Sequence, residues 1–464
     1  MALPRGVLIN KAPVIILNAM SEIHYRLAAL GAGVPEILLP RNGTELSKWA
    51  VIACDQFTQD RAYWEQAKMT AAGAPSCINL IFPEVYLEDG GAETRTRRIR
   101  EIKNSMDSYI REGVFAPPRR CCVYLERSTP RHAMRRGLVL MVDLERYDWA
   151  PETRPLIRST EGTVEERLPP RMEIRRGAPL ELPHILLLID DEDDRLIPAL
   201  GEMARKSPPL YKTPLMMNSG AVTGWALETE ESWAALADGL EALAHKAGGR
   251  YGALPPGEDP FLFAVGDGNH SLATAKAVWE EYKKNHAGEA ELANHSARWA
   301  LVEVENIYDP GISFEPIHRV VFGVEPPELL DALASLKDIR CKMEPPAGRV
   351  IRIESLSAEI ATAGLQPLLD GFVRQRKNCS IDYIHGEEEV LRLTADSSPD
   401  KLASGTAAAA AVPMRQAVGL ILPPVRKDGF FKTVAQSGPL PRKSFSMGDA
   451  WEKRFYLECR RLFR

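Results

Sequence analysis

Residues 261–271, with the sequence FLFAVGDGNHS, join an apolar segment, a glycine-containing turn and the start of an alanine-containing segment. Their pattern predicts a strand over Phe261–Val265 and a helix over Ser271–Lys284. Gly266 and Gly268 allow backbone angles that are closed to other residues and let a ligand approach the main chain. A helix start offers N–H donors and a partial positive charge, which attract phosphate or carboxylate groups. The stretch therefore predicts a strand–turn–helix unit with an anion site at its turn.

The side chains of this turn add chemistry to the backbone. Asp267, Asn269, His270 and Ser271 supply a carboxylate, an amide, an imidazole and a hydroxyl, which suit an anion, a metal-bound phosphate or a proton in transit. The alternative is a tight turn in which Asn269 or Ser271 caps the helix. A cap leaves His270 beside Asp267 without explanation. The spacing lacks the third glycine of a dinucleotide fingerprint and the G-K-[ST] of a P-loop.

The rest of the chain alternates irregularly between strand and helix patterns. Several neighbouring strand patterns are separated by turn signals and predict hairpins, as at Ser219-Gly220. Strand patterns occur at 36–40, 49–54, 123–127, 137–143, 184–189, 215–218, 221–227, 299–305 and 317–321. Helix patterns occur from about Asp60 and at 94–110, 231–246 and 327–336. This mixture predicts an α+β fold, with a mixed sheet, hairpins and packed helices.

The pattern also suggests a domain organisation. We expect an N-terminal appendage over 1–33, an α+β core over 34–325 and a smaller C-terminal α+β region over 326–464. The alanine-rich stretch 404–412 is typical of a linker. We expect the terminal segment 438–464 to return to the core.

Composition excludes several classes of protein. The chain has 464 residues and a formal net charge of −5, with 45% hydrophobic and 26% charged residues, as in an ordinary folded domain. No excess of positive charge favours nucleic-acid binding, and the basic run Arg95–Lys103 is more typical of a solvated helix face. No apolar stretch is long enough to span a membrane. The seven cysteines form no zinc pattern, nor is there a haem or flavin pattern, so we expect reduced thiols in a cytoplasmic protein.

Two further clusters are candidate ligand sites. Asp190 and Asp191 begin an acidic run after an apolar strand, where carboxylates can hold Mg²⁺, although a solvated, negatively charged turn is the usual meaning of such a run. Arg158, Ser159 and Thr160 offer a cation and two hydroxyls that suit a phosphate. A capped turn is the alternative for this second cluster.

Other residues complete the set of candidates. His318 and Arg319 precede a strand-like Val-Val pair, and Arg442 and Lys443 lie in a polar loop near the C-terminus. Each pair has a structural alternative, a satisfied histidine or a packed loop. Cys54 follows an apolar strand, which is more typical of a buried structural thiol than of a nucleophile.

The turn over Asp267–Ser271 resembles the signature of the DUF1015 family, in which a D-G-N/H-H-[RS] element opens a helix. The likeness extends over most of the chain from Glu36 onward. Its matching segments are Glu36–Pro40, Trp49–Thr58, Ser76–Tyr86, Arg158–Thr163, Pro183–Asp191, Met216–Gly220, Pro316–Val320 and Leu440–Gly448.

The same turn is more remotely similar to the nucleotide-binding turn of the ParB/sulfiredoxin superfamily, which includes a free-serine kinase. That resemblance implies that the turn and helix start hold nucleotide phosphates and that an acidic residue nearer the N-terminus is the catalytic base. Glu36 and Asp55 are candidates for the base on position alone. Ser271 stands where many relatives have arginine, so one phosphate-binding cation is missing.

These observations lead to three hypotheses for function. The first is a nucleotide-dependent phosphotransferase that uses Mg²⁺ with ATP or ADP and acts on a small polar metabolite. Asp267 or Asp190/Asp191 would hold the metal, and Arg158 and Arg442 would neutralise phosphate charge. The second is a nucleotide- or metabolite-sensing protein without catalysis. The third is a phosphoester hydrolase that uses His270 and acidic residues.

Overall fold

The structure is a computed structural model that describes residues 22–463 apart from 59, 88, 253–257, 338, 345–347, 357 and 396–415. The chain folds into two compact units. The first contains residues up to 312 together with 431–438 and 450–464, and the second contains 313–430 and 439–449. This boundary lies upstream of the one that we expected at residue 326. The alanine-rich stretch 404–412 lies outside the described residues.

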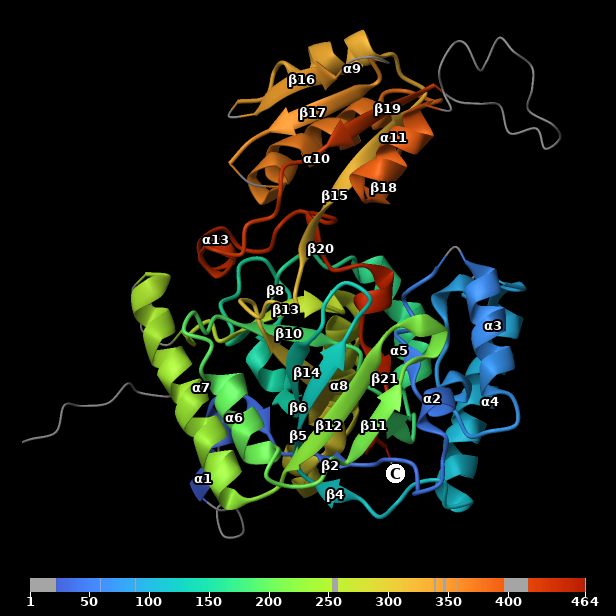
Figure 1. Ribbon diagram of the computed structural model, residues 1–464, viewed down its shortest axis with the longest axis vertical. Helices are drawn as coiled ribbons and strands as arrows, with labels where there is room; N and C mark the ends of the chain where they lie inside the picture. The colour runs from blue at the N-terminus through green and yellow to red at the C-terminus, as the bar shows by residue number, and fades with distance from the viewer. Residues whose placement is uncertain are drawn as a thin grey trace, which may run out of the picture. The chain divides into compact units, whose positions relative to one another are not determined.

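A ten-stranded mixed sheet forms the centre of the first unit (Figure 1). Its strand order is β11-β12-β5-β6-β14-β10-β13-β8-β7, and β1 pairs with β6 beside this path. The strands are β1 (Ala32–Gly33), β5 (Cys122–Ser128), β6 (Arg135–Asp143), β7 (Tyr147–Asp148), β8 (Ile157–Ser159), β10 (Leu186–Ile189), β11 (Tyr211–Pro214), β12 (Ala221–Leu227), β13 (Phe263–Asp267) and β14 (Trp299–Asn306). The expected hairpin of β5 with β6 is present. A second hairpin joins β11 to β12 around Ser219-Gly220, but its first strand is Tyr211–Pro214. The strand predicted at 215–218 is wrong, because Met216–Asn218 forms a 3-10 turn in which Met217 has a φ of 55°.

The pairing of β13 decides which segments meet at its end. β13 is antiparallel to β10, with Asp267 opposite Leu186, and parallel to β8, with Val265 opposite Ser159. The carboxyl end of β13 therefore lies beside the residues that precede β10 and those that end β8. All four residues of β10 are buried, as expected for a central strand with an uninterrupted apolar sequence.

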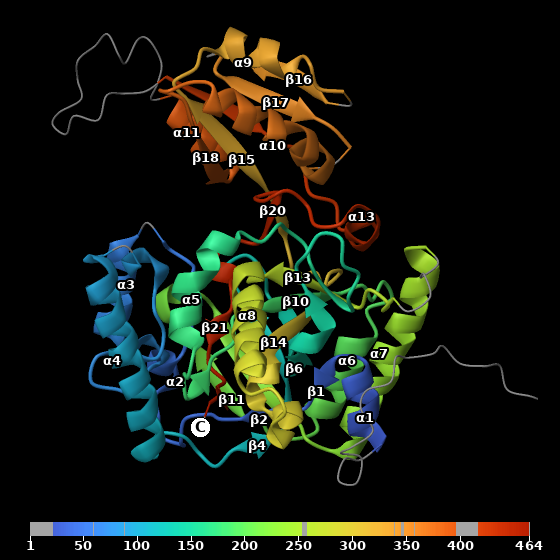
Figure 2. The same cartoon turned by 180° about the vertical axis from the view of Figure 1, so that it is seen from behind.

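The helices of the first unit pack against its large sheet and against one another. Helix α8 crosses the face of the sheet that is turned toward the viewer in Figure 2. It buries Leu272, Ala275, Val278 and Trp279, which recur at helical spacing. Helix α6 packs on β5, β6 and β12, and α1 packs on α7. The helices of the first unit are α1 (Glu22–Ala29), α2 (Leu46–Trp49), α3 (Arg61–Ala71), α4 (Gly91–Arg111), α5 (Leu168–Arg175), α6 (Leu196–Ala204), α7 (Glu230–Arg250) and α8 (Asn269–Asn285).

The terminal segment from residue 450 is part of the first unit. Its strands β21 (Phe455–Tyr456) and β22 (Arg460–Arg461) pair with β3 (Val51–Ile52) and β9 (Leu180–Glu181). A further short pair joins β2 (Glu36–Ile37) to β4 (Arg119–Arg120). Buried Arg454 pairs with Glu458 of the same segment and with Glu303 of β14, and the second ion pair ties the segment to the large sheet in addition to strand pairing.

The second unit has its own smaller sheet, in the order β16-β17-β19-β15-β18, and β20 also pairs with β15. Its core is separate and apolar, with Val321, Leu365 and Leu420 fully buried. Its elements are β15 (Phe314–Phe322), α9 (Pro326–Leu333), β16 (Arg340–Glu344), β17 (Val350–Glu354), α10 (Ala358–Arg374), β18 (Ser380–His385), α11 (Glu387–Ala395), β19 (Ala417–Ile421) and β20 (Phe445–Met447). Helix α13 (Phe430–Ser437) belongs to the first unit from Phe431 onward.

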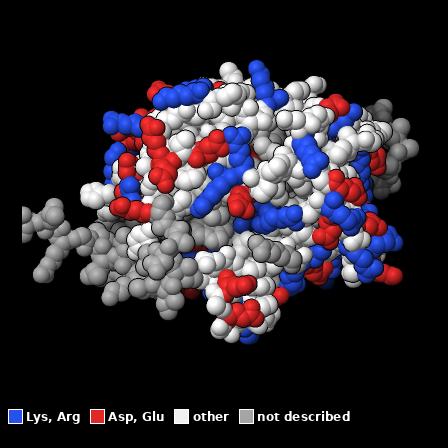
Figure 3. All heavy atoms as spheres, turned by 90° about the horizontal axis from the view of Figure 1, so that it is seen from below, with Lys and Arg blue, Asp and Glu red and all other residues white. Residues whose placement is uncertain are grey.

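The α+β prediction is confirmed, because each unit combines a mixed sheet with helices. None of the described helices is long and apolar enough to cross a membrane. On the face shown in Figure 3, acidic and basic side chains of the described residues are intermixed.

Candidate functional site

The turn between β13 and α8 requires glycine at position 268. Gly268 is the N-cap of α8 and has a φ of 84°, in the left-handed region. A Cβ at this position would lie 3.2 Å from the Cα of Ile185, which precedes β10. Both the backbone angle and the close approach of a second chain segment therefore favour glycine.

Asn269 connects the turn to the end of β8. Its Oδ1 accepts hydrogen bonds from Ser159 Oγ at 2.6 Å and from the Thr160 backbone N–H at 3.3 Å. Thr160 Oγ1 in turn donates to the Val265 carbonyl at 2.5 Å. The parallel pairing of β8 with β13 thus brings two of the predicted hydroxyl residues to the turn.

A chain of hydrogen bonds runs from Ser271 into the interior. Ser271 Oγ lies 2.8 Å from His184 Nε2, and the other ring nitrogen, Nδ1, lies 2.7 Å from the hydroxyl of Tyr456. That hydroxyl also donates to Cys54 Sγ at 3.1 Å. Burial raises the pKa of Cys54 and that of Tyr456, so both groups stay protonated. The thiol is a hydrogen-bonding group here and is poorly suited to act as a nucleophile.

Asp55 faces the same histidine. Its Oδ2 lies 3.7 Å from His184 Nε2, and its Oδ1 accepts a hydrogen bond from Gln56 Nε2 at 3.0 Å. Burial works to raise the pKa of Asp55, but His184, Gln56 and Lys453 outweigh it, so this pKa lies below its ordinary value. Asp55 is therefore held as a carboxylate.

A second carboxyl group near Asp55 behaves in the opposite way. Burial raises the pKa of Glu84, and the negative charge of Asp55 raises it further, despite the ion pair that Glu84 makes with Arg171. The backbone N–H of Glu84 donates to the carbonyl of Cys54 at 2.8 Å, which fixes the two segments to each other. Two neighbouring carboxyl groups with pKa values moved apart are typical of acid–base sites.

Lys453 brings a buried cation to the turn. It is 5% exposed, and its Nζ lies 3.3 Å from Asp267 Oδ1. The other carboxylate oxygen of Asp267, Oδ2, is buried and accepts no hydrogen bond from the described residues. Because a buried charged oxygen is normally satisfied, this atom is a candidate ligand contact.

A cavity of about 150 Å³ lies on the Ser271–His184 side of the turn. Cys54, His184, Ser271 and Tyr456 line one part of it, and the remaining lining is largely apolar. We refer to Asp55, His184, Asp267, Ser271, Lys453 and Tyr456 as the turn cluster.

The structure also locates the other candidates of the first unit. His270 Nε2 accepts a hydrogen bond from the Val164 backbone N–H at 3.3 Å. Arg158 is buried over the ring of Phe261, and its Nε donates to the Pro155 carbonyl at 3.0 Å rather than to the turn. Burial lowers the pKa of Arg158 to about 10, and nearby Arg154 contributes. Gly266 lies within β13, and Glu36 is exposed on β2.

Asp190 and Asp191, the alternative to Asp267 as metal ligands, do not converge with Asp267. Because β10 and β13 are antiparallel, the residues after β10 lie at the opposite end of that strand, roughly 13 Å along it at 3.3 Å per residue. Asp191 Oδ2 instead accepts from the backbone N–H groups of Arg195 and Leu196, at 2.7 and 2.8 Å. This carboxylate therefore satisfies the start of α6.

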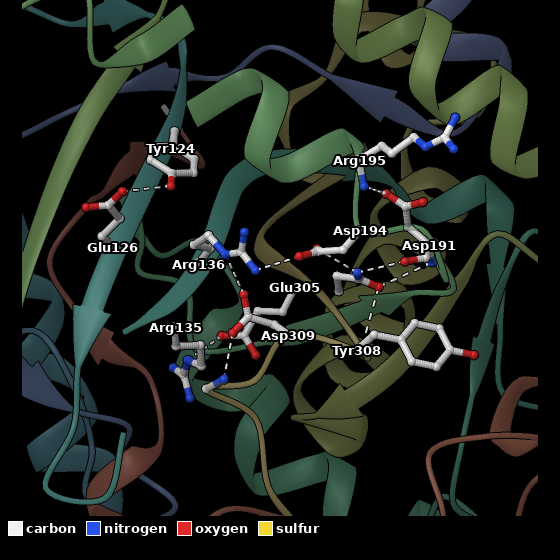
Figure 4. A network of polar contacts seen from close by, with 12 residues as sticks. Tyr124, Glu126, Arg135, Arg136, Asp191, Asp194, Arg195, Glu305, Tyr308 and Asp309 are labelled. Atoms are coloured by element: carbon white, nitrogen blue, oxygen red, sulfur yellow. Dashed lines mark hydrogen bonds and ion pairs between the residues drawn. The ribbon is translucent and has the colours of Figure 1, made fainter. Parts of the chain in front are cut away.

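Other carboxylates of the acidic run are also bound by neighbouring protein groups, and Figure 4 shows the contacts of Asp191 and Asp194. Arg136 donates to Asp194 Oδ2 at 2.6 Å and to Asp309 Oδ2 at 2.8 Å. Asp190 pairs with Arg250 and accepts a hydrogen bond from Tyr251. Among the described residues, no group of three or more His, Cys, Asp or Glu side chains is placed to hold a metal ion.

The remaining candidates lie in the second unit. His318 Nδ1 accepts from the Leu422 backbone N–H at 3.1 Å, and burial lowers the pKa of His318 to about 4. Buried Arg319 donates to Gln366 Oε1 from Nε at 3.2 Å and from Nη2 at 3.1 Å. Arg442 and Lys443 lie in the loop before β20, where Lys443 has a φ of 61°.

Sequence reasoning missed four members of the site. His184 and Glu84 lie in segments that carry the family resemblance, but patterns of hydrophobicity gave them no role. Lys453 and Tyr456 belong to a terminal segment whose pairing partners cannot be identified from spacing. Antiparallel strand order, which periodicity does not reveal, is what places His184 at the turn.

Comparison with known proteins gives a family but no activity. No curated protein matches the chain. Among solved structures, a conserved hypothetical protein from Pyrococcus furiosus is 11% identical with a TM-score of 0.30, covering 67% of this chain and 90% of its own. A free serine kinase in complex with AMP is 10% identical with a TM-score of 0.33, covering 68% and 90%. A variant of a free serine kinase in complex with ADP is 12% identical with a TM-score of 0.32, again covering 68% and 90%.

At such low scores and identities these likenesses establish no shared activity. The family model described as "Protein of unknown function (DUF1015)" matches residues 38–412, which is most of the chain. The chain belongs to the DUF1015 family.

Proposed function

We propose that the first unit transfers the terminal phosphoryl group of a nucleotide, ATP or ADP, to a hydroxyl group of a small molecule. The proposal rests on the arrangement of groups at the start of α8. This helix has glycine as its N-cap and no side-chain cap, and its start lies beside buried Lys453 and the unsatisfied Oδ2 of Asp267. Backbone donors, a helix dipole and a buried cation together suit phosphate oxygens.

The proposed roles follow from position. The start of α8 holds the phosphate oxygens. Lys453 offsets the negative charges of the phosphate and of Asp267. Asp55, kept ionised by His184 and Gln56, accepts the proton of the acceptor hydroxyl. A new oxygen–phosphorus bond forms, the bond to the leaving phosphate breaks, and the nucleotide departs with one phosphate fewer. The transfer depends mainly on positioning and charge, which a rigid turn supplies.

A magnesium ion fits this arrangement in a limited way. Magnesium is commonly bound by one or two carboxylates together with substrate phosphates, so a cage of protein ligands is not required. Asp267 Oδ2 is the carboxylate oxygen suited to such an ion. When bound there with a nucleotide, the ion would neutralise phosphate charge.

A serine hydrolase fits the geometry less well. In a Ser-His-Asp triad the carboxylate binds one ring nitrogen and the serine binds the other. Here Ser271 and Asp55 both face Nε2 of His184, and Nδ1 faces Tyr456. Among the described residues, therefore, no carboxylate faces Nδ1 to orient the imidazole toward Ser271.

The test is a comparison of nucleotide binding with nucleotide turnover. Purified protein is titrated with ATP, ADP and Mg²⁺ while its thermal unfolding is followed, and the same samples are incubated with a mixture of small alcohols and amino alcohols. We expect stabilisation by one nucleotide, about 2.7 kcal/mol at 100 times its Kd, and a phosphorylated product in ³¹P NMR spectra. Stabilisation without any turnover would instead support a nucleotide-sensing protein, and no stabilisation at millimolar nucleotide would contradict both.

A further inference from the structure

The cavity beside the turn cluster has two chemically different parts. One part is formed by Cys54, His184, Ser271 and Tyr456, which carry the hydrogen-bond chain already described. Most of the other lining side chains are apolar, and they include Leu80, Phe82, Met106, Ile174, Leu182 and Leu301. A molecule that fills this cavity meets hydrogen-bonding groups at these four residues and mainly apolar side chains elsewhere, together with the ion-paired residues Glu84, Arg171, Arg175 and Glu181.

The apolar walls come from elements fixed by the core. Met106 lies on α4, Ile174 on α5 and Leu301 on β14, while Leu80 and Phe82 belong to the segment before residue 84. Of these, Leu80, Phe82, Met106 and Leu301 are each less than 5% exposed. Because separate packed elements form the walls, the cavity is a built feature of the fold rather than a gap under one loop.

The charged groups on the lining are already paired with one another. Glu84 forms an ion pair with Arg171, and Arg175 Nη2 lies 2.6 Å from Glu181 Oε1. Each of these charges therefore already has a partner of opposite sign within the protein, with which a charged ligand group would have to compete. The lining therefore favours an uncharged tail over a carboxylate or an ammonium group.

The size of the cavity limits the tail. A cavity of about 150 Å³ with comparable apolar walls accommodates benzene, so roughly six carbon atoms fit. Such a tail would bury its apolar surface away from water, which favours binding in proportion to the area buried. A small polar metabolite, which was our expectation from the sequence, would leave this volume unfilled.

We propose that the acceptor is a neutral alcohol with a hydrocarbon tail of roughly six carbon atoms, seated in this cavity with its hydroxyl at His184 and Ser271. The role as acceptor rests on the proposed function. The hydroxyl oxygen forms the new bond to phosphorus, its proton passes to Asp55, and the nucleotide leaves without its terminal phosphate. The cavity then selects acceptors by the length of their tails.

The experiment measures binding of 1-propanol, 1-butanol, 1-hexanol and 1-octanol by isothermal titration, without nucleotide. We expect affinity to rise about fourfold for each added CH₂ group up to roughly six carbons and then to level off. Affinity that is independent of chain length, or that still rises at the same rate to 1-octanol, would overturn the inference.

Two variants move the preference in opposite directions. Ala178→Leu places a larger side chain on the lining and should shift the optimum to shorter alcohols. Leu182→Ala enlarges the same cavity and should shift the optimum to longer ones. Leu236→Ala, which removes the same atoms from a buried position on α7 outside the lining, is the matched control and should leave the preference unchanged. If one variant fails to fold, the other still tests the direction of the shift.

A separate measurement distinguishes the two proposals. Phosphoryl transfer from ATP and ADP to each alcohol is followed by ³¹P NMR. Chain-length-dependent binding without transfer would overturn the proposed phosphotransferase while the ligand class stands. Transfer only to short polar alcohols, with no binding of hexanol, would overturn the ligand class while the phosphotransferase stands.

Discussion

Helices α7 and α8 both follow strands of the same sheet, but they begin in different ways. The start of α7 is closed by its own sequence, because Thr229 and Ser232 exchange hydrogen bonds in a capping box. The start of α8 has Gly268 as its N-cap and no side-chain cap, and polar groups from other elements surround it. Ser159 arrives from β8, His184 from the segment before β10, and Lys453 from the terminal segment. The hydrogen-bonding groups at the start of α7 are satisfied by residues adjacent in sequence, so this start has a structural role. The start of α8 is surrounded by polar groups from distant elements, which makes it a candidate ligand site.

The largest expected effect is on turnover. Asp55→Asn removes the proposed base near the start of α8. The rate of phosphoryl transfer should fall by ~10²–10⁴-fold, and nucleotide affinity should stay nearly unchanged. Steady-state and binding measurements on the same samples check this. Glu36→Gln, at an exposed position on β2, is the control and should retain full activity. Equal turnover in both variants would remove Asp55 from the mechanism.

The next effect is on nucleotide affinity. Lys453→Met keeps much of the side-chain volume but removes the buried cation beside Asp267. Hydrogen bonds to charged groups contribute about 1.5–3 kcal/mol, so affinity should fall by ~10–150-fold. Isothermal titration with ATP and ADP measures the change. The control is Lys48→Met on α2, where the half-buried lysine pairs with Glu45, and it should leave nucleotide affinity unchanged. An unaltered affinity in Lys453→Met would show that the phosphates lie elsewhere.

A smaller effect separates the two helix starts directly. Gly268→Ala forces alanine into the left-handed region and toward Ile185, which should cost about 1–2 kcal/mol of folding free energy and also weaken nucleotide binding. Thr229→Ala breaks the capping box of α7 and should cost about 1 kcal/mol without any effect on nucleotide binding. Urea unfolding with and without nucleotide measures both quantities. If both variants lose binding equally, the contrast between the helix starts has no functional meaning.

The smallest effect is a dependence of stability on pH. The pKa of Asp55 is lower in the folded protein than its ordinary value, which is about 3.9 in the unfolded chain. Its stabilising contribution is therefore present above pH 3.9 and is lost as the pH falls through the lower folded value. Urea unfolding between pH 2 and 7 should show this loss in the wild type and in Thr229→Ala, because the capping box does not titrate. Asp55→Asn should lack that part of the acid loss, and an unchanged profile would contradict the assigned pKa.

The sequence predicts local structure well and distant convergence poorly. The strand and helix around Asp267 follow from hydrophobic spacing and glycine placement, and both are present. The chemistry of Ser159 and Thr160 makes them candidates, but only the pairing of β8 with β13 brings them to Asn269. The carboxylates of Asp190 and Asp191 make them candidates in the same way, but an antiparallel neighbour places them at the far end of their strand.

The difference between these cases is physical. Short-range periodicity is set by backbone geometry and appears in any window of sequence. Strand order and direction depend on the packing of the whole sheet, so no local pattern reveals that β10 is antiparallel to β13 but parallel to β14. Lys453 and Tyr456 are the extreme case. They follow the second unit in the sequence and yet lie beside residues of the first unit that precede it.

The return of residues 450–464 to the first unit has a consequence for how this protein matures. The ribosome makes residues 313–449 before it makes Lys453 and Tyr456. During synthesis, therefore, the large sheet can begin to assemble while the turn cluster still lacks its cation and its phenol. A nascent chain released within the second unit would carry the glycine turn and the helix start, yet it would have no completed site.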